Sequence, residues 1–207
     1  MKIRPAHEKD IPFIIKGILE IEKINKNDNT YNRLFGTDTV KTIDYLTKIF
    51  EDEENIGTEI SLDTFIIAEI EGVPAGFCCL IHTDKNYYLN KGEIFAIHLE
   101  NKDLQHFTQK ASVLPNHRKY SENKYFIEYI FTHEDFRRRG VAEKMIEYQT
   151  LKTSSHSIHI NVFENKPETI RYYKKLGYKE LIKTPIDIHT NSIYPSKHKI
   201  ILMKKKD

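Results

Sequence analysis

The sequence predicts a mixed α/β fold of the α+β class, in which helices flank a sheet that contains both parallel and antiparallel strands. Two β-rich runs joined at Gly72, over residues 64–71 and 73–81, predict an antiparallel hairpin. From Tyr125 to Gly177, strand and helix patterns alternate as β-α-β-α, which implies a right-handed crossover between two parallel strands. A chain of 207 residues, 39% of them hydrophobic, can build one sizeable core. We therefore expect a single domain over residues 1–207.

The first expected elements are a short strand and two helices. Residues 2–4 predict the strand, after which Asp10 can cap a helix that has Pro12 in its first turn. This helix buries one face through apolar residues at helical spacing, namely Ile11, Ile14, Ile15, Ile18 and Leu19. A polar interval at residues 25–32 precedes a second helical pattern over residues 40–50.

Residues 82–124, which follow the hairpin, are polar and aperiodic. Weak apolar groups at residues 94–99 and 104–107 fit either a short strand or an irregular helix. A connection of this length inside a compact domain is usually functional or disordered.

The second half predicts four strands and two helices. The strands are expected at residues 125–132, 158–163, 178–188 and 193–203. After a turn at residues 133–136, one helix opens near Gly140 with Val141, Ala142, Met145 and Tyr148 on one face. The other helix opens around Asn165 to Glu168, carries the apolar stripe Ile170, Tyr173 and Leu176, and stops at Gly177.

The amino-acid composition of the chain excludes some classes of binding partner. There are 32 Lys and Arg against 30 Asp and Glu, so the net charge of +2 gives no field that favours nucleic acid or an anionic membrane. Cys78 and Cys79 are adjacent, which fits a reducing compartment, and both are expected to be small core residues. No stretch approaches the roughly 20 apolar residues that span a bilayer, and the first residues lack the apolar core of a signal peptide. We expect a cytoplasmic protein with no nucleic-acid or membrane partner.

No metal site is expected. His156 and His159 are the histidines most suggestive of one, but their spacing on a strand sends them to opposite faces.

The strongest chemical pattern is the run Arg137, Arg138, Arg139, Gly140, Val141, Ala142 between a buried strand and a helix. A turn there leaves successive backbone N–H groups unpaired, the helix N-terminus adds partial positive charge, and Gly140 lets a phosphate approach the main chain. Three consecutive arginines are more often a solvated turn, but the strand before and the helix after favour a pyrophosphate cradle. The chain has neither a Walker loop nor a Gly-x-Gly-x-x-Gly fingerprint.

The segment from Tyr125 to Ala142 resembles motif A of the GNAT superfamily of acetyl-CoA-dependent N-acetyltransferases, and the match lies at Arg137, Gly140 and Ala142. Two further segments agree in order. Residues 3–6, leading to Asp10 and Ile11, resemble the opening strand and helix of the family, and residues 170–178 resemble its late motif. The resemblance covers most of the chain except the family-atypical segment 82–124.

The resemblance implies a GNAT-like twisted mixed sheet, flanked by helices, whose central parallel strands splay apart and hold acetyl-CoA, the acetyl donor, in the split. The backbone of Ile130, Phe131 and Thr132 would pair with the pantetheine arm, and Asn165 would touch that arm from the opposite side. The main chain of Arg137, Arg138, Arg139, Gly140, Val141 and Ala142 would hold the pyrophosphate. The sequence departs from the usual family pattern at Glu134, where proline is common.

Moving acetyl from sulfur to nitrogen calls for a base and a proton donor. Tyr173 matches the family tyrosine often assigned as donor to the coenzyme A sulfur, while its place in the apolar stripe gives a core aromatic as the alternative. Glu128 is the sole carboxylate of an otherwise apolar strand, so a raised pKa and a base role, directly or through water, are expected. The alternative is that Glu128 faces solvent or pairs with an arginine.

We therefore expect an N-acetyltransferase that moves acetyl from acetyl-CoA to a primary amine by direct transfer in a ternary complex, with a small molecule as acceptor. The alternatives are a non-catalytic acyl-CoA-binding sensor or interaction module, and an enzyme that acetylates protein N-termini or lysines. Residues 82–124 are expected to form the acceptor side of the cleft and to order in part only when the acceptor is present. Its aromatic residues Tyr87, Tyr88, Phe95, Phe107 and Tyr120 would wall the pocket. An ordered flap that packs on the sheet or mediates a homodimer is the alternative.

Overall fold

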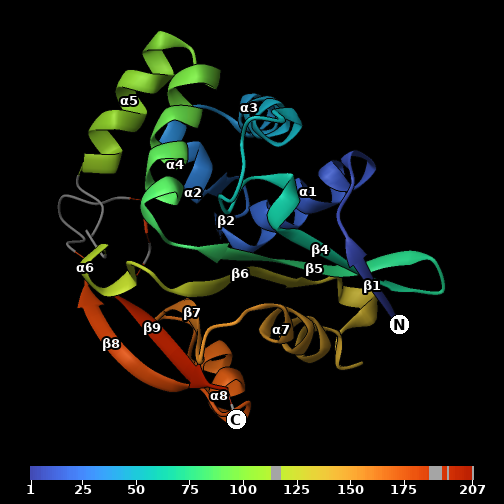
Figure 1. The fold of residues 1–207 in the computed structure, drawn as a ribbon. Coiled ribbons are helices and arrows are strands. Elements are labelled where there is room, and N and C mark those ends of the chain that lie inside the picture. The colour runs from blue at the N-terminus through green and yellow to red at the C-terminus, as the bar shows by residue number, and fades with distance from the viewer. Residues whose placement is uncertain (113–117, 187–192, 195, 207) are drawn as a thin grey trace.

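The computed structural model describes residues 1–112, 118–186, 193–194 and 196–206. Its main sheet has seven strands in the order β1-β4-β5-β6-β7-β9-β8, and a separate two-stranded sheet joins β2 to β3. β6 and β7 run parallel, whereas the other neighbouring pairs are antiparallel. Helices α1 to α5 lie above the sheet in Figure 1, and α7 and α8 lie below it. This arrangement confirms the predicted mixed sheet flanked by helices.

The chain enters through β1 (Lys2–Pro5), the 3₁₀ turn η1 (Glu8–Asp10) and α1 (Ile11–Ile21). Asp10 does not cap α1 with its side chain. Its carboxylate instead accepts the His7 N–H at 2.9 Å and two Arg4 N–H groups at 2.6 and 2.9 Å. The buried Asp10 therefore fixes the angle between β1 and α1.

Two helices follow α1, where the sequence predicted one. β2 (Lys23–Asn25) and β3 (Asp28–Asn29) form a small hairpin, after which Asn29 caps α2 (Thr30–Phe35) by accepting the Asn32 N–H. The predicted helix is α3 (Thr39–Glu51), which is capped by Asp38. α2 escaped notice because six residues are too few to display a helical period.

The predicted hairpin is confirmed as β4 (Phe65–Ile70) and β5 (Val73–His82). Its two turn residues, Glu71 and Gly72, have φ values of 53° and 80°. Two central residues with positive φ match the twist of the flanking strands. On β5, Cys78 and Cys79 are buried and free, as expected for core residues.

The apolar groups at residues 94–99 and 104–107, for which a short strand or an irregular helix was expected, lie in or at the end of regular α-helices. Three helices occupy the described residues of the segment 82–124: α4 (Lys85–His98), α5 (Asn101–Ser112) and the short α6 (Arg118–Ser121). Asp84 caps α4, and the Tyr45 hydroxyl of α3 donates to Asp103 of α5 at 2.7 Å. The helical period of α4 was hidden because this helix buries few residues, namely Tyr87, Ile94 and Phe95.

The second half follows the predicted order, with one correction. It contains β6 (Tyr125–Thr132), the turn η3 (Glu134–Phe136), α7 (Val141–Lys152), β7 (Ser157–Phe163), α8 (Pro167–Lys175), β8 (Lys179–Pro185) and β9 (His198–Lys205). The last strand was expected from residue 193 but begins at His198, and residues 187 and 188 of the strand predicted before it lie outside the described residues. Ser196 accounts for the late start, because its hydroxyl donates to the His198 carbonyl in the turn that leads into β9.

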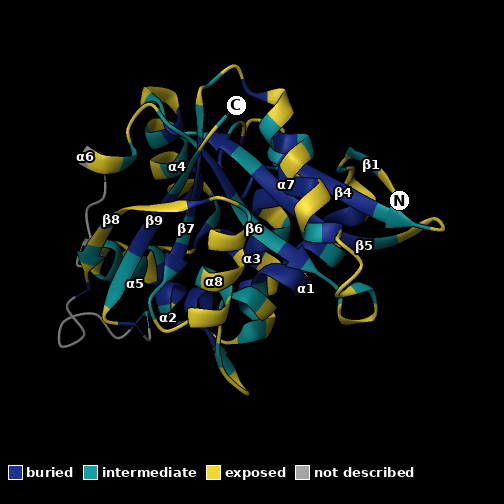
Figure 2. Cartoon of the chain, turned by 90° about the horizontal axis from the view of Figure 1, so that it is seen from below, coloured by how far each residue is buried: buried dark blue, intermediate teal, exposed yellow. Residues whose placement is uncertain are grey.

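Each face of the sheet carries its own apolar core. The upper core joins the sheet to α1 through α4 and includes Phe126 and Ile201, whereas the lower core joins it to α7 and α8 and includes Ile127 and Ile200. Figure 2 shows buried strands behind helices whose outer turns are exposed. Successive side chains of a strand alternate between the two faces. The core to which a strand residue belongs therefore shows which face of the sheet its side chain lies on, and the residues next to it in the strand lie on the other face.

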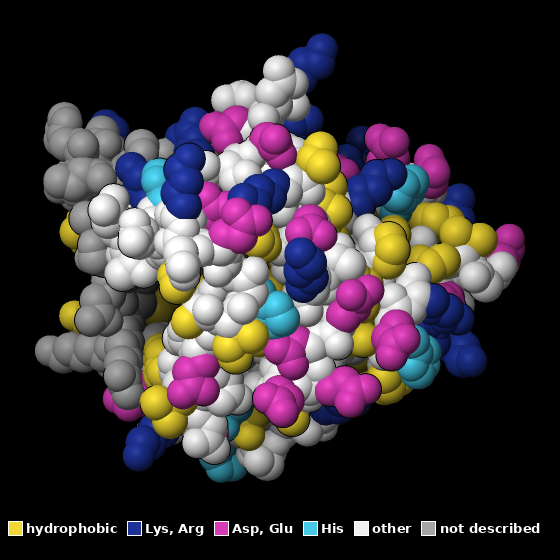
Figure 3. Space-filling view, turned by 90° about the horizontal axis from the view of Figure 1, so that it is seen from above, with side chains coloured by type: hydrophobic (Ala, Val, Ile, Leu, Met, Phe, Trp, Pro, Cys, Tyr) yellow, Lys and Arg dark blue, Asp and Glu magenta, His cyan; other side chains and the backbone are white. Residues whose placement is uncertain are grey.

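The upper surface carries charges of both signs. In Figure 3, Lys and Arg side chains are interspersed with Asp and Glu, and no broad patch of one sign covers the drawn face. Among the described residues, no helix is long and apolar enough to cross a membrane.

Candidate active site

The two parallel strands part soon after they meet. β6 and β7 share the registered pair Phe126 and His159, and the ladder does not continue toward their C-terminal ends. The pairing of β6 with β5 shifts between Phe131 and Glu128, so two residues of β6 stand opposite one of β5. Such a bulge bends its strand. The β6 edge beyond it faces β7 without a strand partner.

Tyr129 marks the bulge. Its φ of 49° lies in the left-handed region, which is strained for a residue with a side chain. Its hydroxyl is 2.6 Å from the hydroxyl of Tyr31 on α2, and burial raises the pKa of both groups. This contact holds the bulge against the upper helices.

A cleft of about 1100 Å³ lies where β6 and β7 separate. Of the residues predicted to touch the coenzyme, Ile130, Phe131, Thr132, Arg137 and Ala142 line it. Both predicted catalytic residues, Glu128 and Tyr173, line it as well. The structure thus brings together in one cleft side chains from β6, α7 and α8 that lie far apart in the sequence.

The remaining predicted coenzyme residues lie outside the cleft lining, which does not include Arg138, Arg139, Gly140, Val141 and Asn165. Val141 is a core residue below the sheet, and the Arg139 guanidinium lies 5.5 Å from the ring centre of Phe136. From the region of Asn165, the cleft receives Lys166, Glu168 and Thr169.

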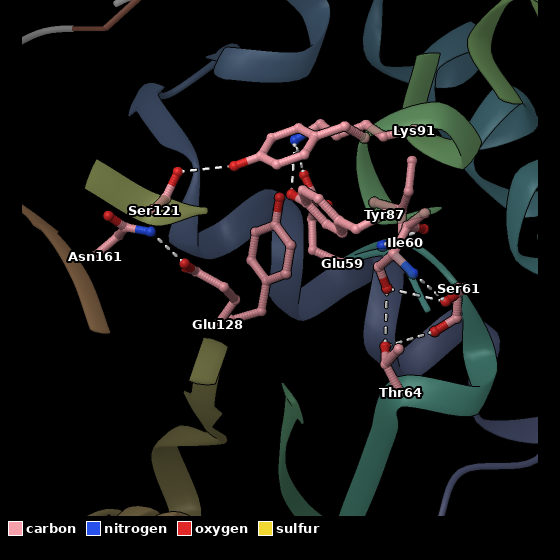
Figure 4. A network of polar contacts seen from close by, with 12 residues as sticks. Glu59, Ile60, Ser61, Thr64, Tyr87, Lys91, Ser121, Glu128 and Asn161 are labelled. Carbon is pink, nitrogen blue, oxygen red and sulfur yellow. Dashed lines mark hydrogen bonds and ion pairs between the residues drawn. The ribbon is translucent and has the colours of Figure 1, made fainter. Parts of the chain in front are cut away.

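Glu128 belongs to the upper face, because the preceding Ile127 lies in the lower core. Its Oε1 accepts a hydrogen bond from Asn161 Nδ2 on β7, so the bond spans the gap between the parting strands (Figure 4). Burial raises the pKa of Glu128 to about 7, against the opposing effects of Lys199 and Asn161. The hydrogen-bond partner of this carboxylate is an amide and not an arginine, and the half-buried side chain lines the cleft. A carboxyl that titrates near neutrality can take up and release a proton under ordinary conditions.

A second charged group lies on the same side of the cleft. Glu59 accepts hydrogen bonds from Lys91 and, at 2.8 Å, from the Tyr87 hydroxyl of α4 (Figure 4). Burial would raise the pKa of Glu59, but Lys91 and these hydrogen bonds hold it below its ordinary value. No sequence pattern pointed to Glu59, because it lies in an irregular segment between α3 and β4.

The aromatic wall is smaller than expected. Tyr87 and Tyr88 line the cleft, whereas Phe95 and Phe107 pack with tilted rings against each other and against Phe35 of α2 in the upper core. Tyr120 is exposed and lies outside the lining. Two of the five expected aromatic residues therefore reach the cleft.

Tyr173 reaches the cleft from α8, on the opposite side of the sheet. It packs in the lower core against Tyr178 and is 7% exposed. No described residue hydrogen-bonds its hydroxyl. Burial raises its pKa, and the charges of nearby groups that include Glu128 add to the rise. Tyr173 therefore stays protonated and has a hydroxyl hydrogen to donate.

The loop before α7 has the backbone of an anion site. Arg138 and Gly140 both have positive φ, 65° and 73°, and no side chain caps the helix N-terminus at Gly140. A Cβ added at Gly140 would meet nothing within 4 Å, so the main chain there is open to a ligand. Arg137 stands at the cleft edge, where it pairs with Glu20 at 3.0 Å. These features fit a pyrophosphate group.

The residues described in the structure hold no group of three or more His, Cys, Asp or Glu side chains that could bind a metal ion.

Comparisons with known proteins agree on one class. A family model described as an acetyltransferase (GNAT) domain matches residues 61–180, more than half of the chain. The chain is similar to the solved structure of an N-acetyltransferase from Staphylococcus aureus Mu50, with 17% identity and a TM-score of 0.74 over 99% of this chain and 100% of that one. No curated protein matches the chain.

Two further solved structures are similar in fold. One is a ribosomal-protein-alanine N-acetyltransferase from Brucella melitensis, with 10% identity and a TM-score of 0.58 over 100% of both chains. The other is a mutant of the spermidine N-acetyltransferase SpeG from Vibrio cholerae, with 13% identity and a TM-score of 0.54 over 99% of this chain and 95% of that one. At these identities the likeness concerns the fold.

Proposed function

The chain belongs to the GNAT acetyltransferase family, and on that premise we propose that it transfers an acetyl group from acetyl-CoA to a primary amine of a small molecule. The transfer is direct, within a ternary complex, and forms no covalent enzyme intermediate. The observation that carries this proposal is Glu128, a carboxylate with a pKa of about 7 at the point where β6 and β7 part.

Coenzyme binding rests mainly on backbone groups. When bound, acetyl-CoA supplies the thioester whose acetyl group is transferred. The main chain from Arg137 to Ala142 holds the pyrophosphate at the open N-terminus of α7. The Arg137 N–H itself donates to the Glu134 carbonyl, and the Arg137 side chain adds charge beside the site. The unpartnered β6 edge from Ile130 to Thr132 offers hydrogen bonds to the amide groups of the pantetheine arm.

Glu128 and Tyr173 act from opposite faces of the sheet. Glu128 takes a proton from the acceptor ammonium, directly or through a water, which frees the nitrogen lone pair for attack. Tyr173 donates its hydroxyl hydrogen to the sulfur as the carbon–sulfur bond breaks. The raised pKa values suit both roles, because Glu128 is ready to gain a proton near neutral pH while Tyr173 still carries its own.

The side chains on the acceptor side favour a small amine. Tyr87, Tyr88 and Lys91 of the α4 helix line the cleft together with Glu128, and Tyr194, which precedes β9, lines it as well. A protein N-terminus or lysine would have to enter between these side chains. The related enzymes act on both kinds of acceptor, since one acetylates a ribosomal protein and another spermidine.

Thioester consumption tests this proposal. The protein is incubated with acetyl-CoA and a panel of amines, peptides and a metabolite extract, and acetylated products are identified by mass spectrometry. We expect acetyl transfer to a small amine that is lost in Glu128→Gln and kept in Glu147→Gln, a matched change at an exposed position of α7. Tight acetyl-CoA binding without any acetyl transfer would favour a sensor, and transfer to peptides alone would favour a protein-directed enzyme.

A further inference from the structure

Lys199 is a charged residue of the cleft that the proposed reaction does not use. It lies on β9, directly opposite Phe163 of β7, and its side chain lines the cleft. Ile201, two positions along β9, belongs to the upper core, and Ile200 between them belongs to the lower core. Lys199 therefore projects to the upper face, as Glu128 and Asn161 do.

The ammonium group of Lys199 has no partner within the described part of the chain. None of the residues that the structure describes forms a hydrogen bond or an ion pair with it. This contrasts with the other lysines of the cleft, because Lys91 is paired with Glu59 and Lys166 donates to the Ile21 carbonyl at 3.0 Å. A cation held among protein atoms without a partner is costly, so a ligand that brings a negative charge would relieve it.

Four charged side chains influence Lys199 from four other parts of the fold: Glu128 on β6, Glu59 in the segment between α3 and β4, Lys91 on α4, and Glu22 after α1. Burial lowers the pKa of Lys199, and among these charges Glu128 opposes that effect most. Glu128 already accepts from Asn161, and Glu59 is engaged with Lys91 and Tyr87. Burial raises the pKa of Glu22, which favours its uncharged form. Of these charged groups, Lys199 is the one left without a hydrogen bond or an ion pair among the described residues.

We propose that Lys199 binds a carboxylate of the acceptor, so that the acceptor is an amino acid whose amine lies at Glu128 and whose carboxylate lies at Lys199. This inference rests on the acetyl transfer proposed above and narrows its substrate class. The two side chains share one face of the sheet on strands separated by β7, so one small zwitterion can meet both. A carboxylate at Lys199 forms a charge-assisted hydrogen bond in a site sheltered from water.

The test uses sets of three acceptors that differ at the carboxylate: a common amino acid, its α-amide, and the amine that remains when the carboxyl group is removed. Each is assayed for acetyl transfer and for binding to the protein saturated with coenzyme A. Wild type is expected to use the amino acid best. In Lys199→Met the kcat/KM for the amino acid falls by about 10- to 100-fold, while the values for the amide and the amine change little. Lys205→Met, at an exposed position of the same strand, keeps the wild-type pattern.

Lys199→Arg is the control for a loss of activity in Lys199→Met that is caused by misfolding. Because this variant keeps a cation at position 199, it should keep the preference for the amino acid. The inference is overturned if wild type prefers the amide, the simple amine or a diamine. It is equally overturned if Lys199→Met lowers the rate for all three acceptors alike. Lys199 would then act on the charge of Glu128 rather than bind the carboxylate of the acceptor. If no amine is acetylated, the proposed function fails and calorimetry decides the inference alone. Amino-acid binding that is lost in Lys199→Met supports it, and the absence of carboxylate-dependent binding contradicts it.

Discussion

The side-chain amide of Asn161 donates a hydrogen bond to Glu128 across the gap where the two parallel strands of the sheet separate. This bond fixes the carboxylate on the face that carries the acceptor side of the cleft. It also stabilises the ionised form, and so works against the burial that raises the pKa of Glu128 to about 7. The hydrogen bond from Asn161 thus affects both the orientation of the Glu128 carboxylate and its pKa.

Removing the amide of Asn161 should raise the pKa of Glu128, so that the carboxyl group is a stronger base and loses its proton only at a higher pH. In Asn161→Leu the carboxylate loses its donor, so its pKa should rise, by something on the order of one unit. The acidic limb of the kcat/KM profile then moves to higher pH while acetyl-CoA affinity stays near the wild-type value. A profile that does not move would show that Asn161 has no influence on the group that titrates.

Tyr173 can be tested with its own neighbour as control. Tyr173→Phe should lower turnover by something on the order of 10²- to 10⁴-fold, because the donated hydrogen is lost. Its hydroxyl has no partner among the described residues, so the melting temperature should change little. Tyr178→Phe removes another buried hydroxyl without a partner, outside the cleft, and should leave turnover unchanged. Equal effects of the two changes would remove Tyr173 from the mechanism.

Gly140→Val should weaken coenzyme binding by covering the open main chain before α7. The positive φ of 73° adds a strain cost of about 1–2 kcal/mol to folding. Gly72→Val is the matched control, because Gly72 has a φ of 80° and an equally open Cβ position but lies in the β4–β5 turn. Calorimetry should show lower acetyl-CoA affinity in Gly140→Val alone. Unchanged affinity in that folded variant would refute the pyrophosphate site.

Asp10 should govern acid stability at the entrance to α1. Burial alone would raise its pKa, but the Arg4 guanidinium and the His7 N–H hold it below the ordinary value. The carboxylate therefore stabilises the fold above the pKa that Asp10 has in the unfolded chain, and this stabilisation is lost as the pH falls through the lower folded pKa. In urea titrations, Asp10→Asn should lower the unfolding free energy by about 2–3 kcal/mol at pH 7 and by less at pH 3. A loss that is the same at both pH values would contradict this role.

The sequence was most informative where one period runs through a whole element. The alternation of strand and helix from β6 to α8, and the glycine of the β4–β5 turn, predicted the sheet with its parallel pair and its hairpin. The candidate base followed from the same strand, because Glu128 interrupts an apolar run. Short-range patterns of this kind need no knowledge of distant contacts.

What escaped sequence reasoning depends on contacts between distant segments. α4 shows no clear apolar stripe, because part of it faces the polar cleft, and α5 is tied to α3 by a contact between Asp103 and Tyr45 that no local pattern reveals. Phe95 belongs to the upper core, so replacing this segment by a short bridge would damage the fold rather than the acceptor site alone. Asn161, Glu59 and Lys199 acquire meaning only when the sheet and the helices bring them to one cleft.

The pH dependence of kcat/KM in wild type and in Glu128→Gln tests the central claim most directly. With Glu128 as base, the wild-type value rises as the pH passes through about 7, because the carboxylate is the active form. In Glu128→Gln this limb disappears, activity at neutral pH falls by something on the order of 10²- to 10⁴-fold, and the deficit shrinks at high pH, where the amine loses its proton unaided. Full activity of Glu128→Gln across the pH range, equal to that of Glu147→Gln, would contradict the account.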